Sequence, residues 1–442
     1  MDKTKRSRAV ETVKDVLIVL LTCSALYLAA RSQLMSPLSG FLREEVPQTG
    51  TVQTESMARA DAARPLRMIA HLEGATGVLR YGVQYDTATS DGLFQQVAGL
   101  LAEALSGAGA PEQITRYQWE QALLTAPGIS FDFQGELPMA VLAGWLAGED
   151  THLEGAVRHL TLTMWQDAVA LYYRDEETGV YYRCLSEMAN GLPLTETLST
   201  LAENGAVYAF ESEDYQDLDP DTLITGEPPV PAVYSASNPM AGGRAALEAL
   251  MDDLGLSVDS SSFYSSGNEQ VARSGNSSIR LSADGTAVYQ ADSEEDSLFL
   301  VSMGRSGASV FEAVEACRKL AADTIGTNCG EARFYLAYAR EGEAGLEVRF
   351  DYCLNGAPVR LEEGPAAWFL VRNGQIVQFE LRFRSYADSG ETTVVLPVRQ
   401  AMAVMDSLGR TGEGLLLMYS DTGGERVTAA WTVTGARTAG GA

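Results

Sequence analysis

From Pro65 onward, apolar residues follow two patterns that predict a mixture of strands and helices. Alternation with polar residues predicts strands, and recurrence every three to four positions predicts helices. In the first half, Asp91 is expected to cap a helix that ends at Gly107, and Trp119 lies on a second helix. The expected helices cover 93–105 and 115–124 and begin again at Pro138, and the expected strands cover 68–72, 79–85, 129–133, 160–164, 168–174 and 180–185.

The second half repeats a helix followed by strands. A hairpin is expected around Asp284-Gly285, and a strand pair around Asn373-Gly374. The expected helices are 241–254, 311–322 and 398–408, and the other expected strands are 278–281, 286–291, 332–339, 346–354, 415–419 and 428–433. The whole pattern predicts an α+β fold of two or three domains, with antiparallel sheets and helices packed on one face.

Proline marks the main predicted boundary. Five of the fifteen prolines lie between Pro220 and Pro239, where they stiffen the chain and remove backbone donors. The predicted division is a basic tail 1–15, a transmembrane helix 16–32, a stalk 33–64, a membrane-proximal α+β domain 65–219, a Pro-rich linker 220–240, a middle segment 241–305, a C-terminal α+β domain 306–436 and a disordered tail 437–442.

The segment Val16–Ala30 is free of charge and follows five Lys/Arg residues within the first fourteen positions. This arrangement predicts a membrane anchor with a cytoplasmic N-terminus and an extracytoplasmic body. Fifteen helical residues cover only about 22 Å, whereas a bilayer core is about 30 Å thick. A cleaved signal peptide, with a site at Ala30-Arg31-Ser32, is therefore the competing interpretation.

Within the predicted anchor, Thr22, Ala25 and Ala29 form one stripe of small residues at spacings of three and four. This stripe is a candidate contact face for another membrane helix, and the alternative is that it faces lipid. Lipidation of Cys23 is disfavoured, because Thr22 precedes it and the apolar run continues beyond it.

Charge is distributed unevenly along the chain. The formal net charge is −27, and residues 1–31 carry +3, which leaves −30 for the remainder. Such a body repels nucleic acid and anionic polymers, so nucleic-acid binding is excluded as a function. The acidic surface either serves solubility or receives a cation or a basic partner.

Catalytic motifs are absent from the sequence. His71, His152 and His159 form neither HExxH nor a neighbour of GxSxG, and they are interpreted as structural or exposed. The acidic runs at 176–177 and 294–296 fall in predicted turns and are interpreted as solvated. A carboxylate pair of the glycosidase kind stays possible because 59 acidic residues are present. We expect no enzyme activity, cofactor or metal site.

The four cysteines outside the anchor have no zinc-site spacing. Cys317 and Cys329 either form a disulfide or, like Cys184 and Cys353, are buried thiols.

Four strand-and-turn motifs in the C-terminal half resemble those of the YycH/YycI family. They are Asp284-Gly285 with Val288-Tyr289, FDYCLNGAPV at 350–359, VRNGQI at 371–376 and AWTV at 430–433. Chain length, and Trp119 followed by the strand at 129–133, are more similar to YycH than to YycI. Ala429 departs from the family, which often has proline there.

The resemblance implies a non-enzymatic, membrane-anchored extracytoplasmic regulator of a Gram-positive two-component system that responds to the cell wall. Its implied partners are a sensor histidine kinase similar to WalK and a YycI-like companion protein, contacted through the transmembrane helix and the ectodomain. Two alternatives stay open: an extracytoplasmic binding or inhibitory module of the PepSY kind, and a wall-acting hydrolase.

Overall fold

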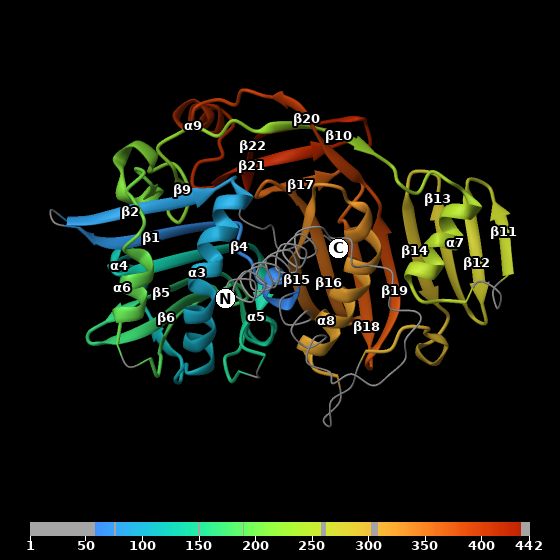
Figure 1. Ribbon diagram of the computed structural model, residues 1–442, viewed down its shortest axis with the longest axis horizontal. Coiled ribbons are helices and arrows are strands. Elements are labelled where there is room, and N and C mark those ends of the chain that lie inside the picture. The colour runs from blue at the N-terminus through green and yellow to red at the C-terminus, as the bar shows by residue number, and fades with distance from the viewer. Residues whose placement is uncertain are drawn as a thin grey trace, which may run out of the picture. The chain divides into compact units, whose positions relative to one another are not determined.

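Seven strands from the first half of the chain form an antiparallel sheet in the order β2–β1–β4–β5–β6–β7–β3 (Figure 1). The computed structural model describes residues 58–74, 77–148, 151–188, 190–257, 262–301 and 308–434. The elements of this half are β1 (Arg67–Gly74), β2 (Gly77–Gln84), α3 (Thr87–Ser106), β3 (Glu112–Ile114), α4 (Arg116–Leu124), β4 (Gly128–Pro138), α5 (Met139–Leu146), β5 (Ala156–Trp165), β6 (Ala168–Asp175), β7 (Tyr181–Leu185) and α6 (Leu192–Leu198).

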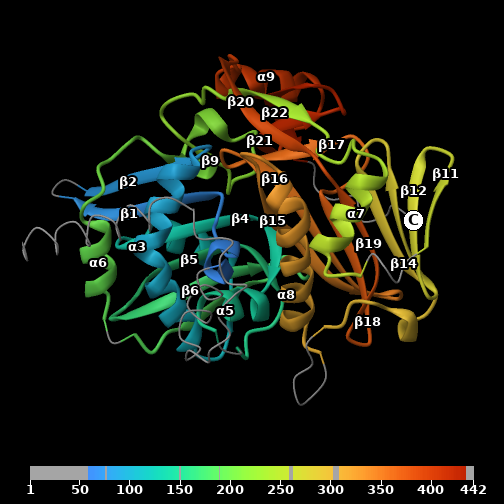
Figure 2. The same ribbon diagram turned by 45° about the vertical axis from the view of Figure 1, so that its right-hand side comes forward.

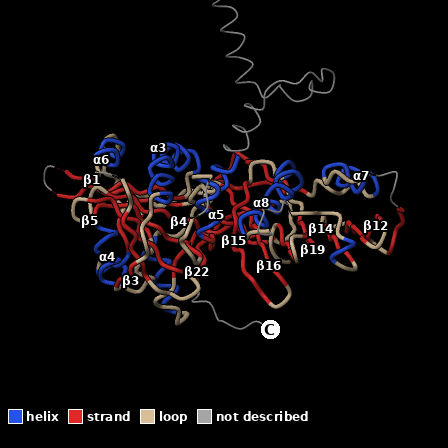
Figure 3. Tube along the Cα trace, turned by 90° about the horizontal axis from the view of Figure 1, so that it is seen from below, coloured by secondary structure: helices blue, strands red, loops and turns tan. Residues whose placement is uncertain are grey.

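Both faces of this sheet are covered by helices. Successive side chains of a strand point to opposite faces, and β1 buries residues on both: Met68, Ala70 and Leu72 on one face, and Ile69 with the polar Arg67 and His71 on the other. Met68 packs in the core that contains the buried stripe of α3, whereas Ile69 packs with Trp119 of α4. Figure 3 shows α4 on the opposite side of the strands from α3 and α6. The prediction that helices pack on one face was therefore wrong for this sheet.

The start of α3 also differs from the predicted one. Asp86 caps the helix, because its carboxylate accepts a hydrogen bond from the backbone N–H of Thr89 at 3.1 Å. Asp91, the predicted cap, instead receives the guanidinium groups of Arg64 and Arg333, at 2.7 Å each. The predicted end at Gly107 is confirmed.

A second run of eight antiparallel strands follows the order β11–β12–β13–β14–β19–β18–β16–β15. Helix α7 packs on β12, and α8 packs on β16 and β18 (Figure 2). The elements are α7 (Arg244–Asp253), β11 (Ser262–Ser266), β12 (Glu269–Ser274), β13 (Ser277–Ser282), β14 (Thr286–Ala291), α8 (Val310–Ala321), β15 (Arg333–Gly342), β16 (Gly345–Leu354), β18 (Ala367–Arg372) and β19 (Gln375–Arg382).

The two runs of strands join where β4 meets β15 in parallel, at the pair Glu136–Tyr338. Gly135 makes this approach possible, since a Cβ atom added there would lie 1.8 Å from the carbonyl oxygen of Leu336. No side chain larger than hydrogen fits at such a distance, so glycine is required by the join itself.

A third group of strands packs beside this join. Strand β17 pairs in parallel with β21, β21 pairs with β22, and β10 lies between β22 and β20. The remaining elements are β8 (Val207–Tyr208), β9 (Leu223–Ile224), β10 (Ala232–Ser237), β17 (Ala357–Leu361), β20 (Ser385–Thr392), α9 (Val398–Ser407), β21 (Gly414–Asp421) and β22 (Arg426–Thr434). The predicted linker 220–240 thus contributes β9 and β10, and all the described residues belong to one compact unit.

Candidate functional site

A cavity of about 550 Å³ lies between the first sheet and the β21–β22 hairpin, and we call it the charged cavity. Strands β1, β4, β5 and β6 supply one wall, and the segment 219–223 with the start of β21 supplies the other. The ionisable side chains that line it are Arg67, Asp132, Glu136, Arg158, His159, Arg174, Glu176, Asp219, Asp221 and Glu413.

Three cations of this cavity, Arg67, Arg158 and His159, contact Asp132, and we call this group the Asp132 hub. The sheet register places Asp132 beside Arg67 on β1 and His159 on β5. Its Oδ2 atom accepts from Nε of Arg67 at 2.9 Å, and its Oδ1 atom accepts from Nε of Arg158 at 3.1 Å. Burial alone would raise the pKa of Asp132, but Arg158 and Arg67 outweigh it and hold the pKa well below its usual range. The Asp132 carboxyl is therefore ionised at neutral pH, and cations surround it.

His159 lies between two carboxylates. Its Nε2 atom is 3.5 Å from Oδ2 of Asp132, and its Nδ1 atom is 3.8 Å from Oε1 of Glu176. Burial would lower the pKa of His159, but the charge of Asp132 and the proximity of Glu176 prevail and raise it to about 9. At neutral pH the imidazole is consequently a cation.

Asp221 is a carboxylate of this cavity with long hydrogen bonds. Its Oδ1 atom lies 3.4 Å from Nε1 of Trp119 and 3.5 Å from Nη2 of Arg116. Burial raises the pKa of Asp221, although the charge of His159 opposes this. Asp221 also lines a small apolar recess next to the cavity, formed with Trp119 and Tyr208.

A second group of interacting residues is centred on Glu315, and we call it the Glu315 hub. It connects the N-terminal end of the described chain, at Arg59, to both halves of the protein. Glu315 on α8 is buried and accepts from Arg318 at 2.7 and 2.9 Å. It also accepts from Nε1 of Trp145 on α5 at 3.0 Å and from Nε of Arg59 at 3.1 Å. Arg59, which belongs to a helical turn at residues 58–62, thereby joins α5 and α8.

The segment that follows this turn leads directly to Asp132. Arg64 pairs with Asp91 at 2.7 Å, and the backbone N–H of Leu66 donates to the carbonyl oxygen of Asp132 at 2.9 Å. Arg67 then binds the Asp132 side chain. Residues 59–67 form a continuous chain of contacts from the Glu315 hub to the charged cavity.

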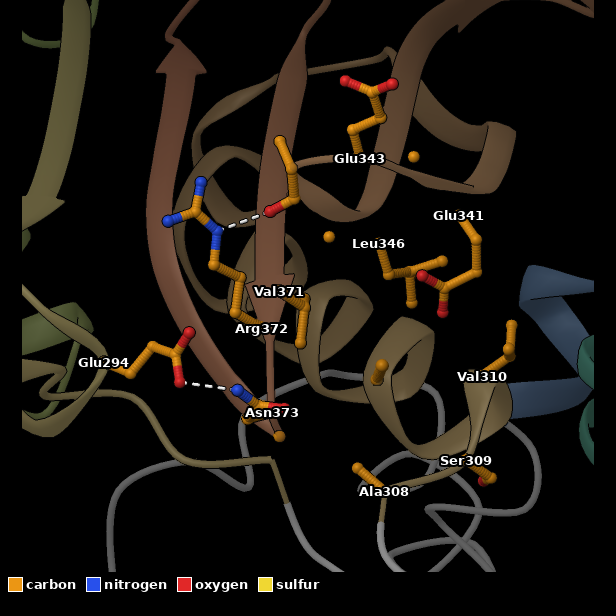
Figure 4. Close-up of a pocket in the computed structure, with 15 residues that line it drawn as sticks. Glu294, Ala308, Ser309, Val310, Glu341, Glu343, Leu346, Val371, Arg372 and Asn373 are labelled. Carbon is orange, nitrogen blue, oxygen red and sulfur yellow. Dashed lines mark hydrogen bonds between the residues drawn. The ribbon is translucent and has the colours of Figure 1, made fainter.

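A cleft of about 800 Å³ opens beside the C-terminal ends of strands β15 and β18 (Figure 4). The turns after β15 and β18 and the start of α8 line it. Asn373 donates to Glu294 at 2.7 Å, and Arg372 donates to the carbonyl oxygen of Ala344, so these polar groups satisfy one another. Glu341 and Glu343 give the cleft an acidic wall.

The predicted contact face, Thr22, Ala25 and Ala29, lies outside the described residues, as does the predicted anchor 16–32. None of the described helices is long and apolar enough to cross a bilayer. All four cysteines outside the anchor are buried free thiols, so the Cys317–Cys329 bridge is not formed. Across the described part of the chain, no three potential ligand side chains gather around a metal position.

Two residues of the cavity wall have contacts or charges that the sequence did not predict. Glu176 was expected to be a solvated turn residue, but it packs against His159 and is mostly buried. Its pKa is lowered, because the contact with His159 outweighs the effect of burial. His159 was expected to be structural or exposed; it is 20% exposed and pairs with Asp132, and what the sequence did not predict is its positive charge.

The Asp132 hub was missed, although the sequence contains a partial signal. Asp132 interrupts the apolar positions Phe131 and Phe133, so alternation places it on the other face of β4. What the sequence alone does not reveal is the register that aligns it with Arg67 and His159.

Neither a scan of protein-family models nor a search of curated proteins finds a match for this chain. A search of solved structures finds the crystal structure of YycH from Bacillus subtilis, with a TM-score of 0.54 at 12% sequence identity. The alignment covers 85% of this chain and 94% of that chain. The motifs on which the resemblance rests lie in β13–β14, β16–β17, β18–β19 and β22. The chain therefore has a YycH-like fold.

Proposed function

We propose that this protein is a non-enzymatic, membrane-anchored extracytoplasmic regulator of a sensor histidine kinase in a two-component system that responds to the cell wall. The observation that carries the proposal is the YycH-like fold, which covers 85% of this chain and 94% of the solved one. The basic-flanked apolar segment 16–30 adds the expected anchor. A WalK-like kinase and a YycI-like companion are the proposed partners.

The membrane helix is the proposed contact with the kinase. Thr22, Ala25 and Ala29 would let another helix approach closely, because small residues permit close backbone packing in a bilayer. The contacts from Arg59 to Arg67 support a connection between that helix and the body, since they attach the membrane-proximal segment to both halves.

The contact face is tested by substitution and crosslinking in the membrane. Ala25→Leu and Ala29→Leu should change kinase output, and a photo-crosslinker at position 25 should capture the kinase. Leu20→Phe is the matched control, because position 20 lies on the opposite face of an ideal helix. Kinase output unchanged in both leucine variants, together with no captured kinase, would refute the proposal.

The two alternatives make different predictions. A binding or inhibitory module acting through its ectodomain alone would keep full activity after release from the anchor. A hydrolase would need one carboxylic acid and one carboxylate with separated pKa values. In the charged cavity, the pKa of Asp221 is raised by burial, whereas those of Asp132 and Glu176 are lowered by neighbouring cations. Wall hydrolysis that disappears in Asp221→Asn would favour that alternative.

A further inference from the structure

The charged cavity is lined by four cations and six carboxylates, and two of its arginines are well exposed. The side chains of Arg174, Arg158 and His159 are 36%, 27% and 20% exposed. Among the lining carboxylates that form ion pairs, Glu413 and Asp132 are 21% and 17% exposed, and Glu136, Asp221 and Glu176 are 6%, 8% and 12% exposed. Arg174 and Arg158 are therefore more exposed than any of these carboxylates, on a chain whose net charge is −27.

The other carboxylates of the cavity are already engaged. Both oxygens of Asp132 accept from arginine, and Glu413 pairs with Arg410 at 3.0 Å. Asp219, which is half-buried, accepts from the backbone N–H of Asp221 at 2.9 Å. Asp219 is thus the carboxylate that would oppose an incoming anion.

Hydrogen-bond donors in the wall also lack acceptors. Nε of Arg174 and Nδ1 of His159 are buried without a hydrogen-bond partner. Glu176 Oε1, at 3.8 Å from Nδ1, is too distant to accept a hydrogen bond. Oε1 of Glu176 is likewise buried without a donor, so the polar atoms of this wall are incompletely satisfied by one another.

We propose that the charged cavity binds a small organic or inorganic anion through a carboxylate or phosphate group received by Arg158, Arg174 and His159. The volume of about 550 Å³ suits a small ligand, and guanidinium groups bind both kinds of oxyanion in a bidentate manner. Such a ligand would touch the cations that hold Asp132, to which Leu66 and Arg67 are bound. Its role as a signal rests on the regulatory function proposed above.

The test is calorimetric titration of the full-length chain in a neutral detergent with succinate, inorganic phosphate and the uncharged succinamide. Saturable one-to-one binding of succinate or phosphate, with none for succinamide, supports the site and identifies the oxyanion. Arg174→Gln should weaken the binding about tenfold or more, since a charge-assisted hydrogen bond is lost. Asp219→Asn should strengthen it, and the distant exposed Arg273→Gln should leave it unchanged.

Absence of saturable binding by both anions, or equal binding in Arg174→Gln and the unmodified chain, would overturn the proposal. Arg174 is the most exposed of these cations and its nearest carboxylate oxygen is 4.0 Å away, so its substitution should leave folding intact. Asp219→Asn supplies an independent change of opposite sign. The titration contains no kinase, so its failure would not bear on the kinase contact, which crosslinking tests separately.

Discussion

Asp132 pairs with one buried cation, Arg67, and with two partly exposed ones, Arg158 and His159, so its removal should destabilise the fold. Asp132→Asn would leave Arg67, Arg158 and protonated His159 without their common anion. We expect the free energy of unfolding to fall by about 3–5 kcal/mol, the usual cost of breaking a buried ion pair from one side. Urea unfolding of the full-length chain, followed by tryptophan fluorescence, measures this loss.

Glu248→Gln is the matched control for that substitution. It removes the same charge from an exposed pair with Arg244 on α7, and such pairs contribute little to stability. Equal unfolding midpoints for Asp132→Asn and Glu248→Gln would contradict the importance of the hub.

The raised pKa of His159 predicts a pH dependence of stability. The ordinary value of 6.5 applies in the unfolded chain, and the folded value is about 9. The stabilisation is therefore fully present below pH 6.5 and is lost as the pH rises through 9, with a total of at most about 3 kcal/mol. The difference in unfolding free energy between the unmodified chain and His159→Gln, measured from pH 6 to 9.5, isolates this contribution. A difference that does not shrink with rising pH would contradict the assignment.

Single residues of the cavity were harder to predict than their strands. Alternation around Phe131 and Phe133 assigned Asp132 to a strand and to its less apolar face. The pKa shifts of His159 and Glu176 arise from neighbours that the register and the turn after β6 bring together, and periodicity carries no information about such pairs.

At the scale of elements, the approach of β4 to β15 depends on one glycine. Gly135→Ala would place a Cβ atom 1.8 Å from the carbonyl oxygen of Leu336, so one strand must move away. We expect a loss of several kcal/mol, because backbone at a paired join cannot yield as a flexible side chain can. Gly92→Ala is the control: position 92 is an exposed helical site with open space, and alanine there should stabilise by up to about 1 kcal/mol. Similar stabilities for the two variants would contradict a close join.

Elements with a strong apolar period were predicted well, and edge elements were not. Helices α4 and α8 and the β6–β7 hairpin begin and end within a few residues of their predicted bounds, and α5 begins next to the predicted Pro138. Strands β11 and β20 were missed, because SFYSS and SYADSGET contain almost no apolar alternation. They become strands through pairing with β12 and β10, which is a tertiary effect that local pattern does not encode.

At the scale of the molecule, two carboxylate hubs connect parts of the chain that are distant in sequence. Glu315 joins Arg59 to α5 and α8, and Asp132 joins Arg67 to β5. The residues between Arg59 and Arg67 are therefore held at both ends. If the body regulates a kinase through its membrane helix, this segment is the mechanical connection between them.

Arg59→Gln should interrupt that connection with little effect on the fold. Arg59 is 30% exposed, and Glu315 keeps Arg318 and Trp145 after the substitution, so the free energy of unfolding should fall by at most about 1 kcal/mol. A kinase-dependent reporter should nevertheless shift in the direction produced by deleting the whole chain. Arg399→Gln, which removes the same charge from an exposed pair with Asp214, should leave the reporter unchanged. A reporter that responds alike to both substitutions would contradict a role for the Glu315 hub in this connection.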